Sequence, residues 1–150
     1  MNGSENNQPF DSTRLRAEIE PELRSVIEDF LELRARWSKT HNMSGPMALA
    51  HSWLTDVADA YALAKCVRRD LPLYDVGSGS GIPGIIVGIL MPGQSVHLVE
   101  PRVKRVAFMR SAIHKLGLKN ISLHRERWPL QQLQTECQVV SRAVVDPAIW

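Results

Sequence analysis

Cysteine is scarce in this chain, and its scarcity argues against two common kinds of site. Cys66 and Cys137 are its two cysteines among 150 residues, and neither belongs to a Cys-x-x-Cys or Cys/His pattern. A structural zinc centre and a disulfide framework are therefore not expected. The five histidines also lack the spacing of metal ligands, so the sequence predicts no metal site.

Long apolar runs are also missing. The longest, from Ile85 to Met91, is interrupted by Gly88 and is far shorter than the ~20 residues that cross a bilayer. The first nine residues are polar and lack the basic segment and apolar core of a secretory leader. We therefore expect a cytoplasmic protein without a membrane anchor. The charged content of 23% and the hydrophobic content of 44% are typical of one folded domain.

Basic residues are concentrated in one segment, although the net formal charge of the chain is only +2. Residues 1–70 hold 9 Lys/Arg and 11 Asp/Glu, a balance of −2, whereas residues 101–127 hold 8 Lys/Arg against Glu126 alone, a balance of +7. Such a segment either contacts a polyanion or forms a solvated helix face. If it binds RNA, Lys104 and Arg105 are the leading candidates for phosphate contacts.

The segment from Leu73 to Gly84 is the most informative part of the sequence. It reads Leu-Tyr-Asp-Val-Gly-Ser-Gly-Ser-Gly-Ile-Pro-Gly, a short apolar strand followed by alternating glycines. Glycine permits a sharp turn and lets the backbone approach a ligand where a Cβ would collide. Pro83 suits the first turn of a helix, whose N-terminal amides are free donors. The pattern predicts a cofactor-binding loop, and a purely structural glycine turn is the alternative.

Two cofactors fit this loop. The spacing Gly79-x-Gly81-x-x-Gly84 matches the dinucleotide pattern of a nicotinamide or flavin enzyme. Asp75 favours S-adenosylmethionine instead, because a carboxylate would repel a pyrophosphate but tolerates the cationic amino acid end of that molecule. Glu100, at the end of the next predicted strand, lies where either fold holds ribose hydroxyls. S-adenosylmethionine is therefore the favoured cofactor, with a nicotinamide-dependent oxidoreductase as the alternative.

Short apolar strands alternate with helical segments from Leu73 onwards, which predicts an α/β fold with a parallel sheet and right-handed crossovers. Strands are expected at 73–77, 95–100, 120–124 and 137–142, and helices at about 82–91, 102–116 and 129–135. Residues 1–150 are expected to form a single domain. Within it, residues 1–70 would be a helical N-terminal extension and residues 71–150 the cofactor-binding part.

The N-terminal extension is predicted to contain three helices. The first is capped by Asp11 or Ser12 and runs through Ile19, and the second begins at Pro21 and ends at about Trp37. Its near-helical apolar stripe consists of Leu23, Ile27, Phe30 and Trp37. A polar loop over residues 38–45 follows, in which Ser44 is expected to cap a third helix running from Pro46 to about Arg69.

Four segments of the chain together resemble the glucose-inhibited division protein B family. These are Trp-Ser-Lys-Thr-His-Asn (37–42), Asp-Val-Gly-Ser-Gly-Ser-Gly-Ile-Pro-Gly (75–84), Glu-Pro-Arg-Val-Lys-Arg-Val-Ala-Phe (100–108) and Val-Ser-Arg-Ala (140–143). The resemblance extends from about residue 23 to the end of the chain. The family consists of bacterial methyltransferases that act on guanine N7 of small-subunit (16S) ribosomal RNA. The resemblance implies the Rossmann-like fold of S-adenosylmethionine-dependent methyltransferases. It also implies 16S rRNA or the small ribosomal subunit as partner.

The resemblance also assigns roles to particular residues. Glu100 would contact the ribose hydroxyls, and Arg142 would lie at the mouth of the site as the catalytic residue, with a surface ion pair as its alternative. The methionine and ribose would contact four loop residues, Gly77, Gly79, Gly81 and Ile82. The adenine would lie beside a three-residue segment after the third strand, Arg127, Trp128 and Pro129. Methyl transfer to guanine N7 needs no general base, which agrees with the absence of a Ser/His/Asp or paired-carboxylate pattern.

Three features depart from the pattern of the family. Trp128 and Pro129 stand where the family has an acidic pair, although an indole can stack on a base. His51 and Asp56 are five residues apart, whereas the family tends to show His-x-x-Asp-Ser. The chain ends at Trp150, where the family continues with further strands. The fold is therefore expected to be truncated after the fourth strand, whose exposed edge predicts self-association. A cofactor-binding interaction module without transfer activity is accordingly a second hypothesis.

Overall fold

The computed structural model describes residues 11–130 and 136–142, and its centre is a parallel sheet of four strands. The strands are β1 (Leu73–Val76), β2 (Val96–Val99), β3 (Ile121–His124) and β4 (Gln138–Ser141). Their order is β3-β2-β1-β4, and Asp75 in the central strand lies opposite Leu98 on one side and Val140 on the other. The predicted α/β, Rossmann-like arrangement and all four expected strands are confirmed.

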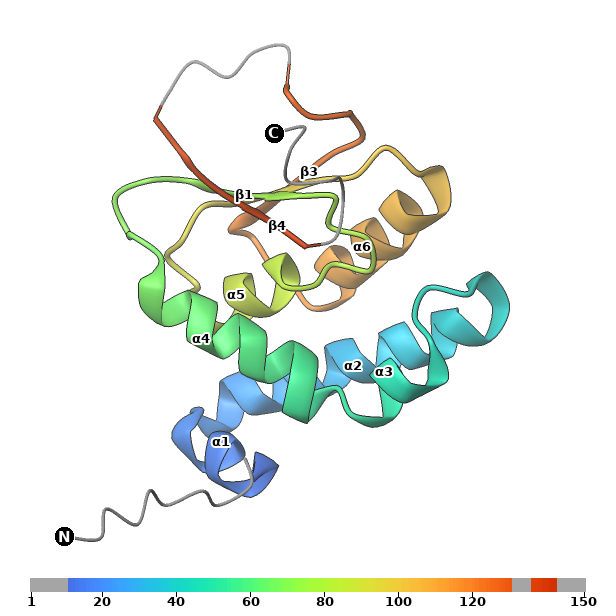
Figure 1. Cartoon of the computed structure of the whole chain (residues 1–150), viewed down its shortest axis with the longest axis vertical. Coiled ribbons are helices and arrows are strands. Elements are labelled where there is room, and N and C mark those ends of the chain that lie inside the picture. The colour runs from blue at the N-terminus through green and yellow to red at the C-terminus, as the bar shows by residue number, and fades with distance from the viewer. Residues whose placement is uncertain (1–10, 131–135, 143–150) are drawn as a thin grey trace, which may run out of the picture.

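Two helices connect the first three strands and cover the same face of the sheet (Figure 1). They are α5 (Gly84–Leu90) and α6 (Val103–Lys115). Helix α5 is almost entirely apolar and buried, and side chains such as Ile85 and Ile86, at 0% exposure, pack beneath the strands. Burial of one such side chain stabilises the fold by about 1.5–3 kcal/mol. Among the described helices, none lies on the opposite face of the sheet.

The N-terminal helices form a further layer beneath α5 and α6 (Figure 1). They are α1 (Ser12–Glu18), α2 (Pro21–His41), α3 (Pro46–Ala50), the π-helical turn η1 (Trp53–Val57) and α4 (Ala58–Cys66). Asp11 caps α1, as predicted, by accepting a 2.9 Å hydrogen bond from the amide of Thr13. Phe30 of α2 meets Phe108 of α6 with ring centroids 6.2 Å apart, and Trp37 reaches the same ring at 5.5 Å. This aromatic contact packs α2 against α6.

Helix α2 is one turn longer than expected, so the prediction of a loop over residues 38–45 was wrong for residues 38–41, whereas residues 42–45 lie outside any helix. The helix continues to His41 and ends because Asn42 adopts a left-handed conformation with φ 50°, and its amide donates to the carbonyl of Ser38. Asparagine tolerates this conformation better than most residues. The predicted cap at Ser44 was also wrong, since Gly45 precedes α3. The Ser44 hydroxyl instead lies 3.4 Å from that of Ser80 in the glycine loop.

The single helix expected from Pro46 to Arg69 is divided into three pieces. Helix α3 stops at Ala50, and the following turn η1 has π-helical geometry, with the amide of Val57 donating to the carbonyl five residues earlier, at Ser52. Helix α4 ends at Cys66 because the next residue, Val67, is extended. The π-helical turn overlaps the interval from His51 to Asp56, where the spacing departs from the family pattern.

Two remaining expectations concern the ends of the elements. Helix α6 stops before Gly117, whose φ of 64° is left-handed. Pro129 and Leu130 are not helical, and the rest of the helix expected over 129–135 lies outside the described residues. Across residues 11–130 and 136–142, no helix is both long enough and apolar enough to cross a membrane.

Candidate functional site

Three parts of the predicted site come together at the carboxyl edge of the sheet. The glycine loop follows β1, Glu100 follows β2 and Arg142 follows β4, and parallel strands bring these ends to one edge. The connections leave β1 in one direction toward β2 and return on its other side at β4. Parallel sheets bind ligands in the crevice at such a reversal of strand order. The predicted loop and the predicted arginine therefore flank the position where a ligand is expected.

The glycine loop is held in one conformation by its own hydrogen bonds. Gly77, Gly79 and Gly81 have φ values of 73°, 59° and 84°, a region that other residues rarely adopt. The Ser78 hydroxyl donates to the carbonyl of Asp75 at 2.7 Å and accepts from the amide of Val99 at 3.1 Å. The amide of Gly81 donates to the Ser78 carbonyl at 2.8 Å. The turn is thus fixed without a ligand.

Asp75 is buried beneath the loop, where it caps helix α5. Its side chain accepts a 2.9 Å hydrogen bond from the amide of Gly84, and the residue is only 1% exposed. Pro83 precedes the helix instead of forming its first residue, which corrects the predicted start. Burial raises the pKa of the Asp75 carboxyl to about 6, against the smaller, opposing effects of the Gly84 amide and the Arg142 guanidinium. The Gly84 amide at the start of α5 was predicted to be free for a ligand, but it donates to Asp75 instead.

Glu100 holds the loop from the other side. One carboxylate oxygen accepts from the amide of Gly79 at 3.0 Å and the other from the amide of Arg102 at 2.9 Å. The residue is 3% exposed. A carboxylate oxygen can accept more than one hydrogen bond, so these contacts leave capacity for ribose hydroxyls. Ile82, by contrast, is 5% exposed and belongs to the hydrophobic core, which directs its side chain away from solvent.

These hydrogen bonds fit a phosphate-free nucleoside better than a dinucleotide. A pyrophosphate is normally bound by free amides at a glycine-rich turn and a helix start. In this loop the amides of Gly79 and Gly84 donate to carboxylates, and that of Gly81 donates to a backbone carbonyl. Two buried acids would also repel a phosphate. The donor set therefore agrees with S-adenosylmethionine, which carries none.

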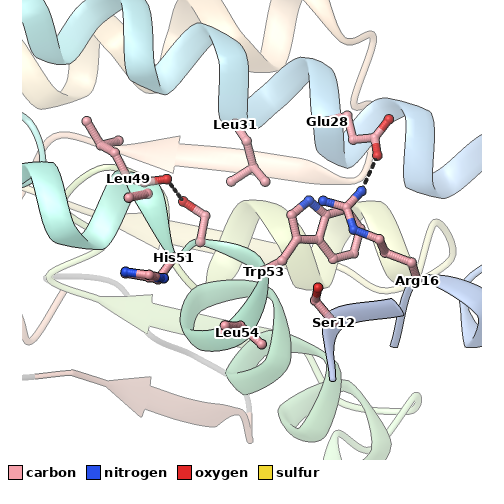
Figure 2. A pocket seen from close by; sticks show the side chains of 10 residues that line it. Ser12, Arg16, Glu28, Leu31, Leu49, His51, Trp53 and Leu54 are labelled. Atoms are coloured by element: carbon pink, nitrogen blue, oxygen red, sulfur yellow. Dashed lines mark hydrogen bonds and ion pairs between the residues drawn. The ribbon is translucent and has the colours of Figure 1, made fainter. Parts of the chain in front are cut away.

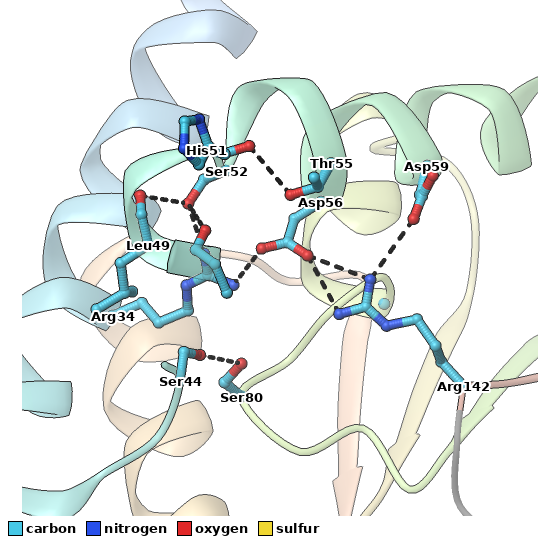
Figure 3. A network of polar contacts seen from close by, with 12 residues as sticks. Arg34, Ser44, Leu49, His51, Ser52, Thr55, Asp56, Asp59, Ser80 and Arg142 are labelled. Atoms are coloured by element: carbon cyan, nitrogen blue, oxygen red, sulfur yellow. Dashed lines mark hydrogen bonds and ion pairs between the residues drawn. The ribbon is translucent and has the colours of Figure 1, made fainter. Parts of the chain in front are cut away.

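Arg142 is connected to the N-terminal helices by a network of polar contacts (Figure 3). Its guanidinium donates to Asp56 at 3.1 and 3.2 Å and lies 3.6 Å from the carboxylate of Asp59. The second oxygen of Asp56 accepts from Arg34 at 2.8 Å, and Arg34 also donates to the Ser52 hydroxyl at 2.7 Å. Arg34 and Asp56 are 1% and 3% exposed, whereas the Arg142 side chain is 51% exposed. The ion-pair alternative for Arg142 is thus observed, at the edge of the predicted site.

The segment proposed for adenine lies partly elsewhere. The Trp128 indole packs against Tyr74 in β1, with ring centroids 5.9 Å apart. Tyr74 also stacks on His97 at 4.4 Å, so these rings form a cluster on the sheet. Arg127 and Pro129 are exposed. The Trp128 indole was predicted to stack on adenine. It packs instead against Tyr74, three residues before the glycine loop.

A separate pocket of about 350 Å³ lies among the N-terminal helices (Figure 2). The Arg16 guanidinium lies 4.0 Å above the Trp53 ring and 2.6 Å from the Glu28 carboxylate. His51 and Leu49 also line the pocket. None of the predicted cofactor residues lines this pocket, so its size alone does not make it the site. Within the described ranges, no group of three or more His, Cys, Asp or Glu side chains is arranged to hold a metal ion.

Comparison with known proteins matches most of this chain to one family. The family model described as GidB, rRNA small subunit methyltransferase G, matches residues 24–147. The Ribosomal RNA small subunit methyltransferase G of Dichelobacter nodosus is 30% identical over 132 residues, which cover 85% of this chain and 61% of that protein. The proteins of the same name from Beutenbergia cavernae and Wolinella succinogenes are 30% and 33% identical over 79% of this chain, covering 56% and 61% of their own lengths.

The chain therefore spans about three fifths of the length of these relatives. The matched range nevertheless includes the glycine loop, Glu100 and Arg142, together with the α2 to α4 helices that hold Arg142 in place. On the strength of that match, the chain belongs to the GidB family.

Proposed function

We propose that this chain binds S-adenosylmethionine and takes part in methyl transfer to guanine N7 of 16S ribosomal RNA. The observation that carries the proposal is the arrangement of the glycine loop, Glu100 and Arg142 at one edge of the sheet, where the strand order reverses. The names of the relatives support rRNA as the substrate. We further propose that residues 1–150 act as one cytoplasmic unit on the small ribosomal subunit.

The residues of the site divide into those that bind and those that position. Gly77, Gly79 and Gly81 provide a backbone surface without side chains for the methionine and ribose, and Glu100 accepts from the ribose hydroxyls. Asp75 holds the loop against α5 through the Gly84 amide. Ile82 contributes through the core beneath the loop. Arg127, Trp128 and Pro129 stay candidates for the adenine side, which requires that this segment approach the loop on binding.

The chemistry requires alignment more than proton transfer. Bound S-adenosylmethionine supplies an electrophilic methyl group on a sulfonium. It would give this methyl to the lone pair of guanine N7, and the electron pair of the broken carbon–sulfur bond would stay on sulfur. No proton has to leave N7, so this chain needs no general base. Orienting two reactants can lower a barrier by about 7–11 kcal/mol, and Arg142, at the mouth, is the group proposed to orient the guanine or its phosphate.

RNA binding is proposed for the exposed cations around helix α6. Arg102 and Lys104 are both exposed at the start of this helix. Changing both to Gln should reduce the slope of log affinity against log salt by about one unit for each phosphate that the chain no longer neutralises. Lys65→Gln, on the exposed surface of α4, is the matched control. A double variant with the parental slope would mean that this face is only solvated.

Two other functions are separated from the proposal by experiment. Titration calorimetry with S-adenosylmethionine, S-adenosylhomocysteine and NAD should show binding of the first two ligands and none of NAD. NAD binding alone would favour an oxidoreductase, although the amide pattern of the loop argues against it. Incubation with small ribosomal subunits and methyl-labelled cofactor then separates an enzyme from a cofactor-binding module. Cofactor binding without label on 16S rRNA would support the module.

A further inference from the structure

Arg105 of helix α6 lies against the glycine loop. Its Nη1 atom is 2.7 Å from the position that a Cβ on Gly79 would take, and its Cζ atom is 3.9 Å from that position. The guanidinium therefore fills the space left by the missing side chain of Gly79. On its amide side, Gly79 is held by Glu100. The same glycine thus has a carboxylate at its N–H and a cation over its Cα.

Arg105 differs from the other cations of its segment in burial. The remaining Lys and Arg side chains of residues 101–127 are all exposed: Arg102, Lys104, Arg110, Lys115, Lys119, Arg125 and Arg127. Arg105 alone in this set is partly buried. A side chain that leaves the solvated face and rests on the loop is poorly placed for the phosphate contacts predicted for this segment.

Arg105 also differs from the other arginines near the sheet edge in its partners. Arg34 and Arg142 are both paired with Asp56. No carboxylate in the described part of the chain lies within ion-pair distance of Arg105. A guanidinium presents a planar fork of donors that matches a carboxylate bidentately. The loop therefore carries a partly buried cation without a carboxylate partner among the described residues.

We propose that Arg105 binds the carboxylate of the amino acid part of the cofactor. This inference rests on the proposed function, because Gly77 to Ile82 is the segment assigned to the methionine. A carboxylate approaching the Cα side of Gly79 meets the guanidinium that already lies there. Glu100 accepts from the amide of the same residue, which leaves the ribose hydroxyls to Glu100 and the carboxylate to Arg105. The two ends of the ligand are thus distinguished by charge across one glycine.

The test compares two ligands that differ in the amino acid part. S-adenosylhomocysteine has a carboxylate, whereas 5′-methylthioadenosine keeps the nucleoside and lacks the whole amino acid. In calorimetric titrations of the full chain, Arg105→Gln should weaken S-adenosylhomocysteine about 10- to 100-fold and leave 5′-methylthioadenosine within about twofold. Arg110→Gln, an exposed arginine on the same helix, should change neither affinity. Arg105→Lys, which keeps the charge but loses the fork, should give an intermediate loss for S-adenosylhomocysteine only.

Several outcomes would overturn the inference. Equal losses for both ligands would mean that Arg105 supports the loop as a whole, and no loss for either would remove it from the site. A flatter salt dependence of RNA binding in Arg105→Gln, with S-adenosylhomocysteine affinity unchanged, would assign Arg105 to RNA. If Arg105→Gln does not fold, the comparison rests on Arg105→Lys, and equal effects on both ligands would again contradict the inference. If the parent chain binds neither ligand, the proposed function itself fails, a result distinct from all of these.

Discussion

Arg142 donates two hydrogen bonds to the same oxygen of Asp56, at 3.1 and 3.2 Å. One residue follows strand β4 and the other belongs to the π-helical turn η1, 86 positions earlier in the chain. The second oxygen of Asp56 accepts a hydrogen bond from Arg34 of helix α2. Asp56 therefore joins three separate elements, and it sets the direction of the arginine that we place at the mouth of the site.

Removing the charge of Asp56 should destabilise the fold strongly. Arg34 is 1% exposed, so Asp56→Asn leaves a buried guanidinium without a countercharge, a change that typically costs about 3–5 kcal/mol. Urea denaturation followed by circular dichroism measures the loss. Asp59→Asn is the control, because Asp59 is 66% exposed and lies 3.6 Å from Arg142. Its loss should stay below about 1 kcal/mol, and equal losses for both variants would contradict the role given to Asp56.

Gly84, Gly79 and Gly93 should respond differently to alanine. A Cβ on Gly84 would lie 2.3 Å from Leu98 and 2.6 Å from the Asp75 carboxylate, inside a packed core, so Gly84→Ala should lose about 3 kcal/mol or more. The close neighbour of a Cβ on Gly79 is the flexible end of Arg105, so Gly79→Ala should lose about 1–2 kcal/mol from its left-handed backbone. Gly93, with open space around it, should tolerate alanine within about 0.5 kcal/mol.

The effects of Gly79→Ala and Gly93→Ala on ligand affinity should differ more than their effects on stability. Gly79→Ala should lose S-adenosylhomocysteine binding while still folded, because its Cβ would take the position next to which Arg105 lies and would displace the guanidinium. Gly93→Ala should bind as the parent does. Calorimetry on the folded variants measures both affinities. An unchanged affinity in folded Gly79→Ala would remove Gly79 from the site.

Asp75 should make the ligand-free protein less stable as pH rises. Its pKa is about 6 in the folded chain against an ordinary value of 3.8, so the folded state holds the proton more tightly than the unfolded state. The favourable contribution is complete below pH 3.8 and is lost as pH rises through 6. At about 1.4 kcal/mol per pKa unit, the loss is about 3 kcal/mol. In Asp75→Asn, this part of the pH dependence should vanish, and parallel stability profiles of the two proteins would contradict the assignment.

The two valines of β4 should tolerate lysine differently. Val140 packs against the hydrophobic core, whereas Val139 is 42% exposed. Val140→Lys should therefore destabilise the fold by about 2 kcal/mol or more, and Val139→Lys should be nearly neutral. If the chain self-associates through β4, as its place at the edge of the described sheet suggests, Val139→Lys should shift the population toward monomers in sedimentation velocity. A parent that sediments as a monomer at high concentration would contradict self-association.

The strand positions and the glycine loop could be predicted because each depends on local pattern. A buried strand followed by alternating glycines determines the turn, and an acid at the end of the next strand reaches it once the strands pair. The hydrogen-bond partners of the loop amides could not be predicted from the sequence. Nothing in the spacing shows that Gly84 donates to Asp75, or that Arg105 turns from the basic helix face onto Gly79. These contacts depend on how α5 and α6 pack.

The network around Asp56 was missed although the sequence contains a signal for it. Ile27, Phe30 and Trp37 form the predicted apolar stripe of α2, and Arg34 lies on the same face at helical spacing. A buried arginine requires an acid, but which one depends on the path of the chain after α3. The π-helical turn contains Asp56 and positions it beside Arg34. Its only sequence signal is the five-residue spacing between His51 and Asp56.

The strand order has a consequence for the sequence of assembly. Strand β1 obtains its first neighbour, β2, after one short helix, but its other neighbour, β4, follows only after α6 and β3. Contacts between distant parts of a chain form late because closing long loops costs entropy. On a nascent chain, Gly79 and Glu100 can meet long before Arg142 has been synthesised. The docking of β4 against β1 and the arrival of Arg142 at Asp56 then occur together, so a late step of folding is also the step that places Arg142 at the mouth of the proposed site.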